Sequence, residues 1–239
     1  MLIYHGTSAN NLDSILNNGI NPRSDRKSNW DKYESRDDMA YLTLAYPFYY
    51  AACVAENDDS LVVFEINCDK LDESKLYPDE DYIAQVVSEQ DAVPLNEVHF
   101  IIRDNIDKWK DLWESSLEKM GNICYKGNVP ISCVTRYVVV DTKEFNSHIY
   151  LDLLDPSICP LNYAIKGEYY RNLVNWFFGD REKLPQIDEA KKFLENFVGV
   201  LGKQPSLGGL DDLAKIQKDR IEYLEIQSGN KKGIEVVSL

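Results

Sequence analysis

The sequence has few of the residues that commonly hold metals or cross-link small folds. Its three histidines, His5, His99 and His148, lie far apart, and their spacing does not match a metal-binding pattern. Its five cysteines form no C-x-x-C pair, and their odd number argues against a disulfide framework. We therefore expect reduced cysteines and no metal centre.

Long apolar runs are also absent. No segment approaches the roughly 20 apolar residues that a membrane-spanning helix needs. The first residues do not show a basic segment followed by an apolar run, the pattern of a secretory signal. These features predict a soluble, cytoplasmic protein that does not bind a membrane.

Positive charge is scarce, since 26 Lys and Arg residues oppose 40 Asp and Glu residues and the formal net charge is −14. Each contact with a nucleic-acid phosphate normally requires Lys or Arg, so strong non-specific binding to nucleic acid is not expected. One local basic stretch runs from Arg23 to Arg36 and includes Arg26, Lys27 and Lys32. We favour a solvated loop over a nucleic-acid site for this stretch.

The chain begins with an apolar run that leads directly into a histidine, Leu2-Ile3-Tyr4-His5-Gly6-Thr7-Ser8. Such a run predicts a buried strand that carries His5 to the point where the backbone turns away. Ser8 can cap a following helix, which Gly19 would end. His5 has two interpretations, a core histidine whose ring nitrogens are satisfied by neighbours and a residue of a binding site.

A second strand and helix are predicted between residues 39 and 55. Met39 to Thr43 reads as a short buried strand, and Pro47 permits a helix to begin close behind it. That helix would carry the rings of Tyr49 and Tyr50. Because clustered aromatic residues usually form a core, each ring has a structural interpretation beside a binding one.

The rest of the N-terminal part also follows recognisable patterns. The apolar spacing of residues 106–120 predicts an amphipathic helix that Gly121 ends. Residues 76–82 predict a Pro-centred acidic turn, and Glu65 is expected to face outward from its strand. Further strands are predicted at residues 61–66, 122–127 and 133–140.

The order of these motifs resembles the ADP-ribosyltransferase superfamily, in particular bacterial or phage members of the His-Gly-Thr type. The resemblance covers residues 1–142 and rests on His5-Gly6-Thr7, on Tyr41-Leu42-Thr43 and on the turn from Gly127 to Pro130. It implies an α+β fold in which two antiparallel sheets form a split β-barrel around an NAD cleft.

The resemblance also implies roles for single residues. In the superfamily the strand tyrosine, here Tyr41, lies against nicotinamide, and a tyrosine of the next helix completes the stack. We prefer Tyr49 over Tyr50 for that second position. NAD is the implied substrate, without a metal. The implied NAD-binding residues are His5, Gly6, Thr7, Tyr41, Thr43 and Tyr49.

One position departs from the superfamily's pattern. Active relatives carry a catalytic glutamate at the start of the strand that follows the amphipathic helix, and the matching residue here is Asn122. The implied catalytic residues are therefore His5, Tyr41 and Asn122. An amide lacks the negative charge that favours departure of nicotinamide, and losing such help typically costs on the order of 10²-fold or more in rate. Glu118 is a possible substitute, although an exposed helical acid is the preferred interpretation.

Three functions remain open. The first is an ADP-ribosyltransferase that moves ADP-ribose from NAD to a macromolecular acceptor and releases nicotinamide, as a toxin or a defence factor. The second is a catalytically inactive NAD- or nucleotide-binding module that acts through a protein partner. The third, an RNA 2′-phosphotransferase, fits less well, because those enzymes surround their substrate with arginines and only Arg103 and Arg136 lie in the later core.

The chain changes character after residue 142. Residues 160–178, 187–201 and 210–226 look helical, so we expect an ADP-ribosyltransferase-like domain at 1–142 and a small helical C-terminal region at 143–239. The first of these helices is rich in aromatic residues. Packing against the first domain is the preferred interpretation, and a face for a protein partner is the alternative. The final residues, 231–239, read as a tail or a short strand.

Overall fold

The structure is a computed structural model, and it describes residues 1–23, 35–55, 58–91, 97, 101–102, 105–143, 162–181 and 233–239. Several predictions of the sequence analysis lie outside these residues. They are the basic residues Arg26, Lys27 and Lys32, the histidines His99 and His148, Arg103, and the helices at 187–201 and 210–226.

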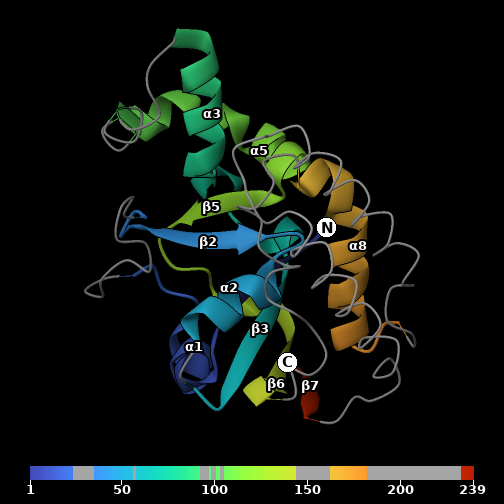
Figure 1. The fold of residues 1–239 in the computed structure, drawn as a ribbon. Helices are drawn as coiled ribbons and strands as arrows, with labels where there is room; N and C mark the ends of the chain where they lie inside the picture. Colours follow the sequence, from blue (N-terminus) through green and yellow to red (C-terminus); the bar gives the residue numbers. More distant parts are fainter. Residues whose placement is uncertain are drawn as a thin grey trace.

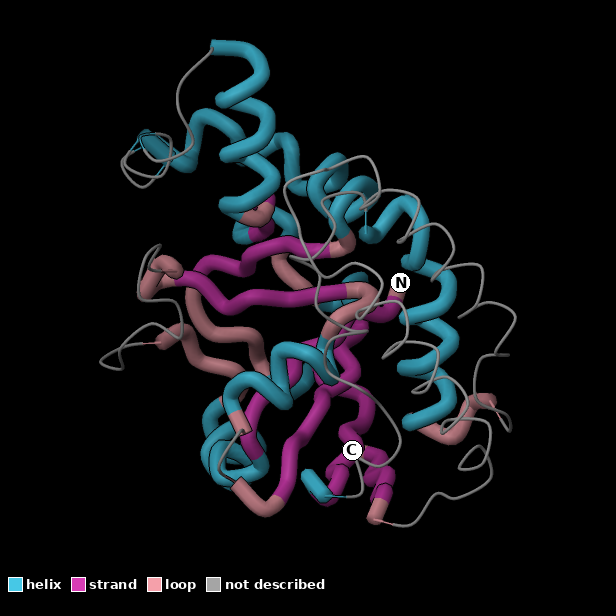
Figure 2. The backbone as a smooth tube through the Cα atoms, in the orientation of Figure 1, coloured by secondary structure: helices cyan, strands magenta, loops and turns pink. Residues whose placement is uncertain are grey.

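The described strands form one antiparallel sheet of seven, in the order β4-β5-β2-β1-β3-β6-β7 (Figure 2). Together with the helices it confirms the α+β class. The predicted turn at 76–82 instead begins with a strand, and the tail residues form the edge strand β7. The strands are β1 (Leu2–Ser8), β2 (Met39–Thr43), β3 (Ser60–Asn67), β4 (Leu76–Pro78), β5 (Asn122–Lys126), β6 (Val134–Asp141) and β7 (Ile234–Ser238).

The described helices are α1 (Leu12–Asn18), α2 (Pro47–Val54), α3 (Glu80–Asp91), α5 (Trp113–Met120) and α8 (Asn162–Phe177). Short 3₁₀ helices lie at Ala9–Asn11, Cys68–Lys70, Glu73–Lys75, Ile106–Leu112 and Ile131–Cys133. The segment predicted as one helix over 106–120 is therefore a 3₁₀ helix that continues as α5. None of the described helices combines the length and the apolar character that crossing a bilayer requires.

The sheet divides almost completely between β1 and β2. These two strands pair at one position, Tyr4 opposite Thr43, whereas β1 and β3 pair at seven positions and β2 and β5 at five. In Figure 1, β2 and β5 lie across the view, whereas β3 is steeply inclined to them. The described strands thus form two differently directed halves of one open sheet, and a split barrel is not confirmed.

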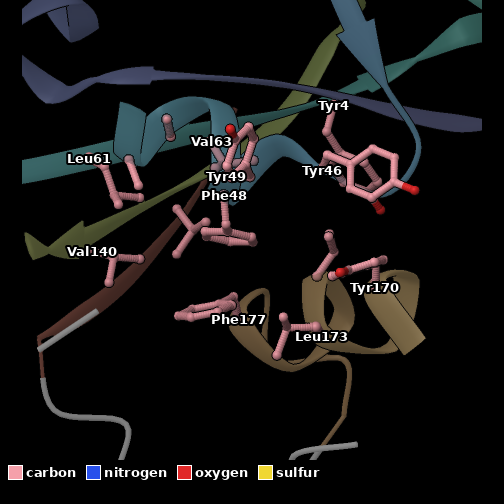
Figure 3. Packing of buried hydrophobic residues seen from close by; sticks show 14 of the residues in the cluster. Tyr4, Tyr46, Phe48, Tyr49, Leu61, Val63, Val140, Tyr170, Leu173 and Phe177 are labelled. Carbon is pink, nitrogen blue, oxygen red and sulfur yellow. The ribbon is translucent and has the colours of Figure 1, made fainter. Parts of the chain in front are cut away.

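One core lies where α2 and α8 cover the sheet (Figure 3). Phe48 of α2 stacks on Phe177 of α8, with ring centroids 4.1 Å apart, and Tyr170 and Trp176 of α8 are fully buried. These contacts confirm that aromatic residues of α8 pack against the sheet. Because β7 also pairs with β6, parts of the C-terminal region are built into the same sheet and core. The division at residue 142 stays a prediction.

The predicted outward orientation of Glu65 is wrong. Its side chain is buried, and the Nε and Nη2 atoms of Arg136 on β6 donate to its two carboxylate oxygens at 2.9 and 2.6 Å. Arg136 also donates to Asp180, which follows α8. The pair forms because Glu65 lies opposite Arg136 in the sheet, and the pattern of a single strand cannot show such a partner.

Candidate functional site

His5 and Tyr41 meet where β1 and β2 separate. The Nδ1 atom of His5 lies 3.0 Å from the main-chain carbonyl oxygen of Tyr41. Because a carbonyl only accepts, Nδ1 donates in this bond, and Nε2 of the neutral ring is left as an acceptor. Burial lowers the pKa of His5 and outweighs the opposing effect of this bond, so the ring is neutral at physiological pH.

The residues predicted on β2 and β5 share one face of the sheet. Tyr41 pairs with Cys124 and Thr43 pairs with Asn122, and side chains at paired positions point to the same side. Asn122 follows Gly121, which ends α5 in the left-handed conformation at φ 74°. The helix stop therefore sets where β5 begins and where Asn122 lies.

Asn122 is held by a tyrosine from α2. The residue is only 6% exposed, and its Nδ2 donates to the hydroxyl oxygen of Tyr50 at 3.1 Å. Its Oδ1 is buried and has no hydrogen-bond partner among the described residues. Burial is also the main reason why the pKa of Tyr50 is raised. An unsatisfied buried acceptor is unusual and is suited to a ligand that can donate.

The α2 tyrosine beside Asn122 is thus Tyr50, whereas Tyr49 is the one preferred from the sequence. Tyr49 is buried in the aromatic core between α2 and the sheet (Figure 3), and its ring meets that of Tyr50 edge-on at 5.5 Å. The helical pattern alone could not separate the two, because both residues are aromatic and adjacent.

A carboxylate reaches the ring of Tyr41. The Tyr41 hydroxyl donates to Oε2 of Glu80, the first residue of α3, at 2.7 Å and accepts from the main-chain nitrogen of Arg36 at 2.8 Å. Burial raises the pKa of both Tyr41 and Glu80. No chemistry is predicted for Glu80 from the sequence, because the acidic turn carries no signal of its contact with Tyr41.

Three further predicted residues have structural partners. The Thr43 hydroxyl donates to the carbonyl oxygen of Gly121 at 3.1 Å and accepts from the main-chain nitrogen of Tyr46 at 3.1 Å, so it ties β2 to the start of β5. Thr7 accepts from Asn11 Nδ2 at 2.9 Å. Gly6 allows α2 to lie directly on β1, since a Cβ atom there would lie 1.9 Å from the carbonyl oxygen of Pro47.

Glu118 is exposed on α5, as the preferred interpretation of that residue expected. Within the described ranges, no group of three or more His, Cys, Asp or Glu side chains is arranged to hold a metal ion. A shallow hollow of about 320 Å³ is lined by Glu73, Ser74, Lys110, Asp111 and Trp113, none of which is a predicted site residue.

In comparisons with models of known protein families and with curated proteins, nothing matches this chain. The function is therefore inferred from the residues at the division between β1 and β2 and on the face that β2 and β5 share.

Proposed function

We propose that the protein is an ADP-ribosyltransferase that uses NAD, with its pocket where β1 separates from β2. The observation that carries this proposal is the buried, unpartnered Oδ1 of Asn122, held beside Tyr50 on the face that also carries Tyr41. The proposal includes the split β-barrel that the resemblance implies. In this proposal the barrel is split between β1 and β2.

The available groups fit the chemistry of NAD. Ribose hydroxyls can donate hydrogen bonds, and Asn122 Oδ1 and Nε2 of neutral His5 can each accept one. Nicotinamide is a flat aromatic ring, and the partly buried rings of Tyr41 and Tyr50 offer faces on which such a ring can stack. Gly6, Thr7 and Thr43 contribute by fixing the backbone around these groups rather than through free side-chain donors.

The proposed reaction is a group transfer at ribose. The bond between nicotinamide N1 and ribose C1′ breaks, and its electron pair leaves with nicotinamide. A lone pair on the acceptor forms the new bond to C1′, and the acceptor's proton passes to water. The part of His5, Tyr41 and Asn122 is to bind and orient the two riboses and the nicotinamide ring.

The identity of Asn122 favours a second candidate, an inactive module that binds NAD or a nucleotide and acts through a protein partner. An amide binds ribose but supplies no charge to the reaction. The partner would contact the C-terminal region.

The third candidate, an RNA 2′-phosphotransferase, has less support. Arg136 is one of the two core arginines that this function would require, and its guanidinium is engaged by Glu65 and Asp180. It is therefore poorly placed to bind a phosphate.

The first two candidates can be separated with NAD labelled in its phosphates. Purified protein is incubated with this NAD and a cell lysate, and the macromolecules are then denatured and washed. A transferase leaves covalent label, whose sensitivity to protease or nuclease identifies the acceptor class. Tyr50→Ala should remove the label, whereas Ser14→Ala on the exposed side of α1 should retain it. Binding of NAD without label or nicotinamide release would support the inactive module.

A further inference from the structure

The chain that leaves β4 passes directly beside Asn122. Strand β4 is antiparallel to β5, with Tyr77 opposite Cys124 and Pro78 opposite Ile123. Asp79 is the next residue in this register, and it therefore comes beside Asn122. The carboxylate of Asp79 raises the pKa values of Tyr41, Tyr50 and Cys124, so it lies on the side of the sheet that carries Tyr41, Cys124 and Asn122.

A serine of α5 joins the two positions. The main-chain nitrogen of Asp79 donates to Ser116 Oγ at 3.0 Å, and Ser116 Oγ donates to the carbonyl oxygen of Asn122 at 2.8 Å. Ser116 is fully buried. The backbone of Asp79 is therefore fixed against the start of β5 through one side chain.

The carboxylate of Asp79 caps the N-terminus of α3. Asp79 Oδ1 accepts from the main-chain nitrogen of Asp81 at 2.9 Å, and a main-chain hydrogen bond from Tyr82 also stabilises the ionised carboxylate. A separate observation indicates that this face binds a ligand. Asn122 is 6% exposed, and its Oδ1 has no hydrogen-bond partner among the described residues.

We propose that Asp79 supplies the carboxylate toward ribose that the neighbouring position, Asn122, lacks. The inference rests on the proposed transferase function. In this arrangement the acid lies at the end of β4, one strand away from its position in the superfamily's pattern, and Asn122 is left to bind a ribose hydroxyl. Asp79 acts through its negative charge while the N1–C1′ bond breaks and C1′ becomes positive.

The surroundings of Asp79 keep it protonated until a positive ligand arrives. Burial, together with the negative charges of Asp81 and Glu80, raises the pKa of Asp79 to about 8. The other titratable groups that sense Asp79 are Tyr41 on β2, Tyr50 on α2 and Cys124 on β5, and none of them is a cation at neutral pH. The positive charge of the nicotinamide ring would favour the ionised form, so NAD binding should release a proton.

The decisive variant is Asp79→Asn, because asparagine caps a helix as well as aspartate does and removes only the charge. We expect nicotinamide release to fall about 10²-fold or more, with the dissociation constant for NAD changed only a few-fold. In wild type the rate should rise between pH 6 and pH 9, and in Asp79→Asn it should not. Calorimetry in two buffers with different ionisation enthalpies should detect proton release on NAD binding in wild type only.

Two further variants separate charge from structure. Asp79→Asn with Asn122→Asp returns the carboxylate to β5 and should recover on the order of tenfold of the lost rate. Asp81→Asn removes a neighbouring charge from the exposed side of α3, so it should keep the maximal rate and shift the pH profile to lower pH.

The outcomes distinguish the inference from the function on which it rests. An active wild type and an equally active Asp79→Asn would overturn the role of Asp79 and leave the transferase intact. A wild type that releases no nicotinamide would overturn the transferase and this role together. Loss of activity in Asp79→Asn without loss of stability, and with loss of the proton release, supports the inference.

Discussion

The hydroxyl of Tyr50 on α2 accepts a hydrogen bond from Nδ2 of Asn122 on β5 at 3.1 Å. This bond joins the helix that lies on β1 to the strand that lies beyond β2. The hydrogen bond therefore spans the gap between β1 and β2, on the side of the sheet where Tyr41 and Asp79 lie. The proposed pocket depends on this connection, because it fixes which atom of Asn122 is left for a ligand.

Tyr50→Phe should destabilise the protein by about 1–3 kcal/mol, since it leaves a buried amide donor without its acceptor. Urea unfolding measures the change. Tyr137→Phe is the control, because Tyr137 is also buried, at 9% exposed, and it contacts the ring of Phe64. Equal stability of the two variants would show that the Tyr50 contact contributes nothing to folding.

Arg136→Met should be one of the most destabilising substitutions in β6. It leaves Glu65 buried without its cation, and removing one partner of a buried ion pair costs about 3–5 kcal/mol. Asp69 offers the comparison, since it pairs with the N-terminal amine while 75% of its side chain is exposed. Asp69→Asn should cost less than about 1 kcal/mol. Chemical denaturation of both variants tests the difference, which would vanish if Glu65 were solvated.

Gly6→Ala should loosen α2 from the sheet. A Cβ atom at this position would lie 1.9 Å from the carbonyl oxygen of Pro47, so the helix must move, at a cost of about 3 kcal/mol or more. Gly127→Ala meets no atom within 4 Å and carries only the strain of φ 85°, about 1–2 kcal/mol. Thermal unfolding compares the two, and a smaller loss for Gly6→Ala would contradict the close approach of α2.

His5 predicts a dependence of stability on pH. Its pKa is lowered by burial in the folded state, so between the folded and the unfolded pKa the unfolded chain binds more protons. Stability is then fully present above the unfolded value of about 6.5 and is lost as the pH falls through the folded pKa. Urea unfolding at pH 8 and pH 5.5 should show a larger loss for wild type than for His5→Gln. Equal losses would mean that His5 is free to protonate.

Asp79 predicts the opposite trend. Its raised pKa means that the folded state binds more protons than the unfolded chain between pH 3.8 and about 8, so this group lowers stability as the pH rises through that range. Asp79→Asn should therefore be more stable than wild type at pH 8.5, with a smaller difference at pH 5. Urea unfolding of both proteins at pH 8.5 and at pH 5 measures these differences. A variant less stable than wild type at pH 8.5 would show that the ionised Asp79 carboxylate does not destabilise the folded protein.

Most of the N-terminal elements could be predicted from the sequence, because short-range residue patterns determine where they begin and end. The run before His5, the Pro47 start of α2 and the glycine at residue 19 each act on the few residues around them, and β1, α2 and the end of α1 follow. The strand β4 was missed because it is only three residues long and contains Pro78. As an edge strand it tolerates a proline.

Contacts between distant segments could not be predicted in the same way. The burial of Glu65 depends on Arg136, which lies 71 residues later. The choice between Tyr50 and Tyr49 depends on which side of α2 meets β5, and Asp79 gains its place only because β4 pairs with β5 in one register. These are tertiary relationships, so the residue types alone carry no signal of them.

Release of nicotinamide from NAD by the purified protein tests the central claim most directly, measured for wild type, His5→Ala and the exposed-surface control Ser14→Ala. We expect release by wild type and by Ser14→Ala, and its loss in His5→Ala, because His5 lies at the division between β1 and β2 where NAD is proposed to bind. Absence of release in all three proteins, or equal release by His5→Ala, would contradict a transferase site at this division.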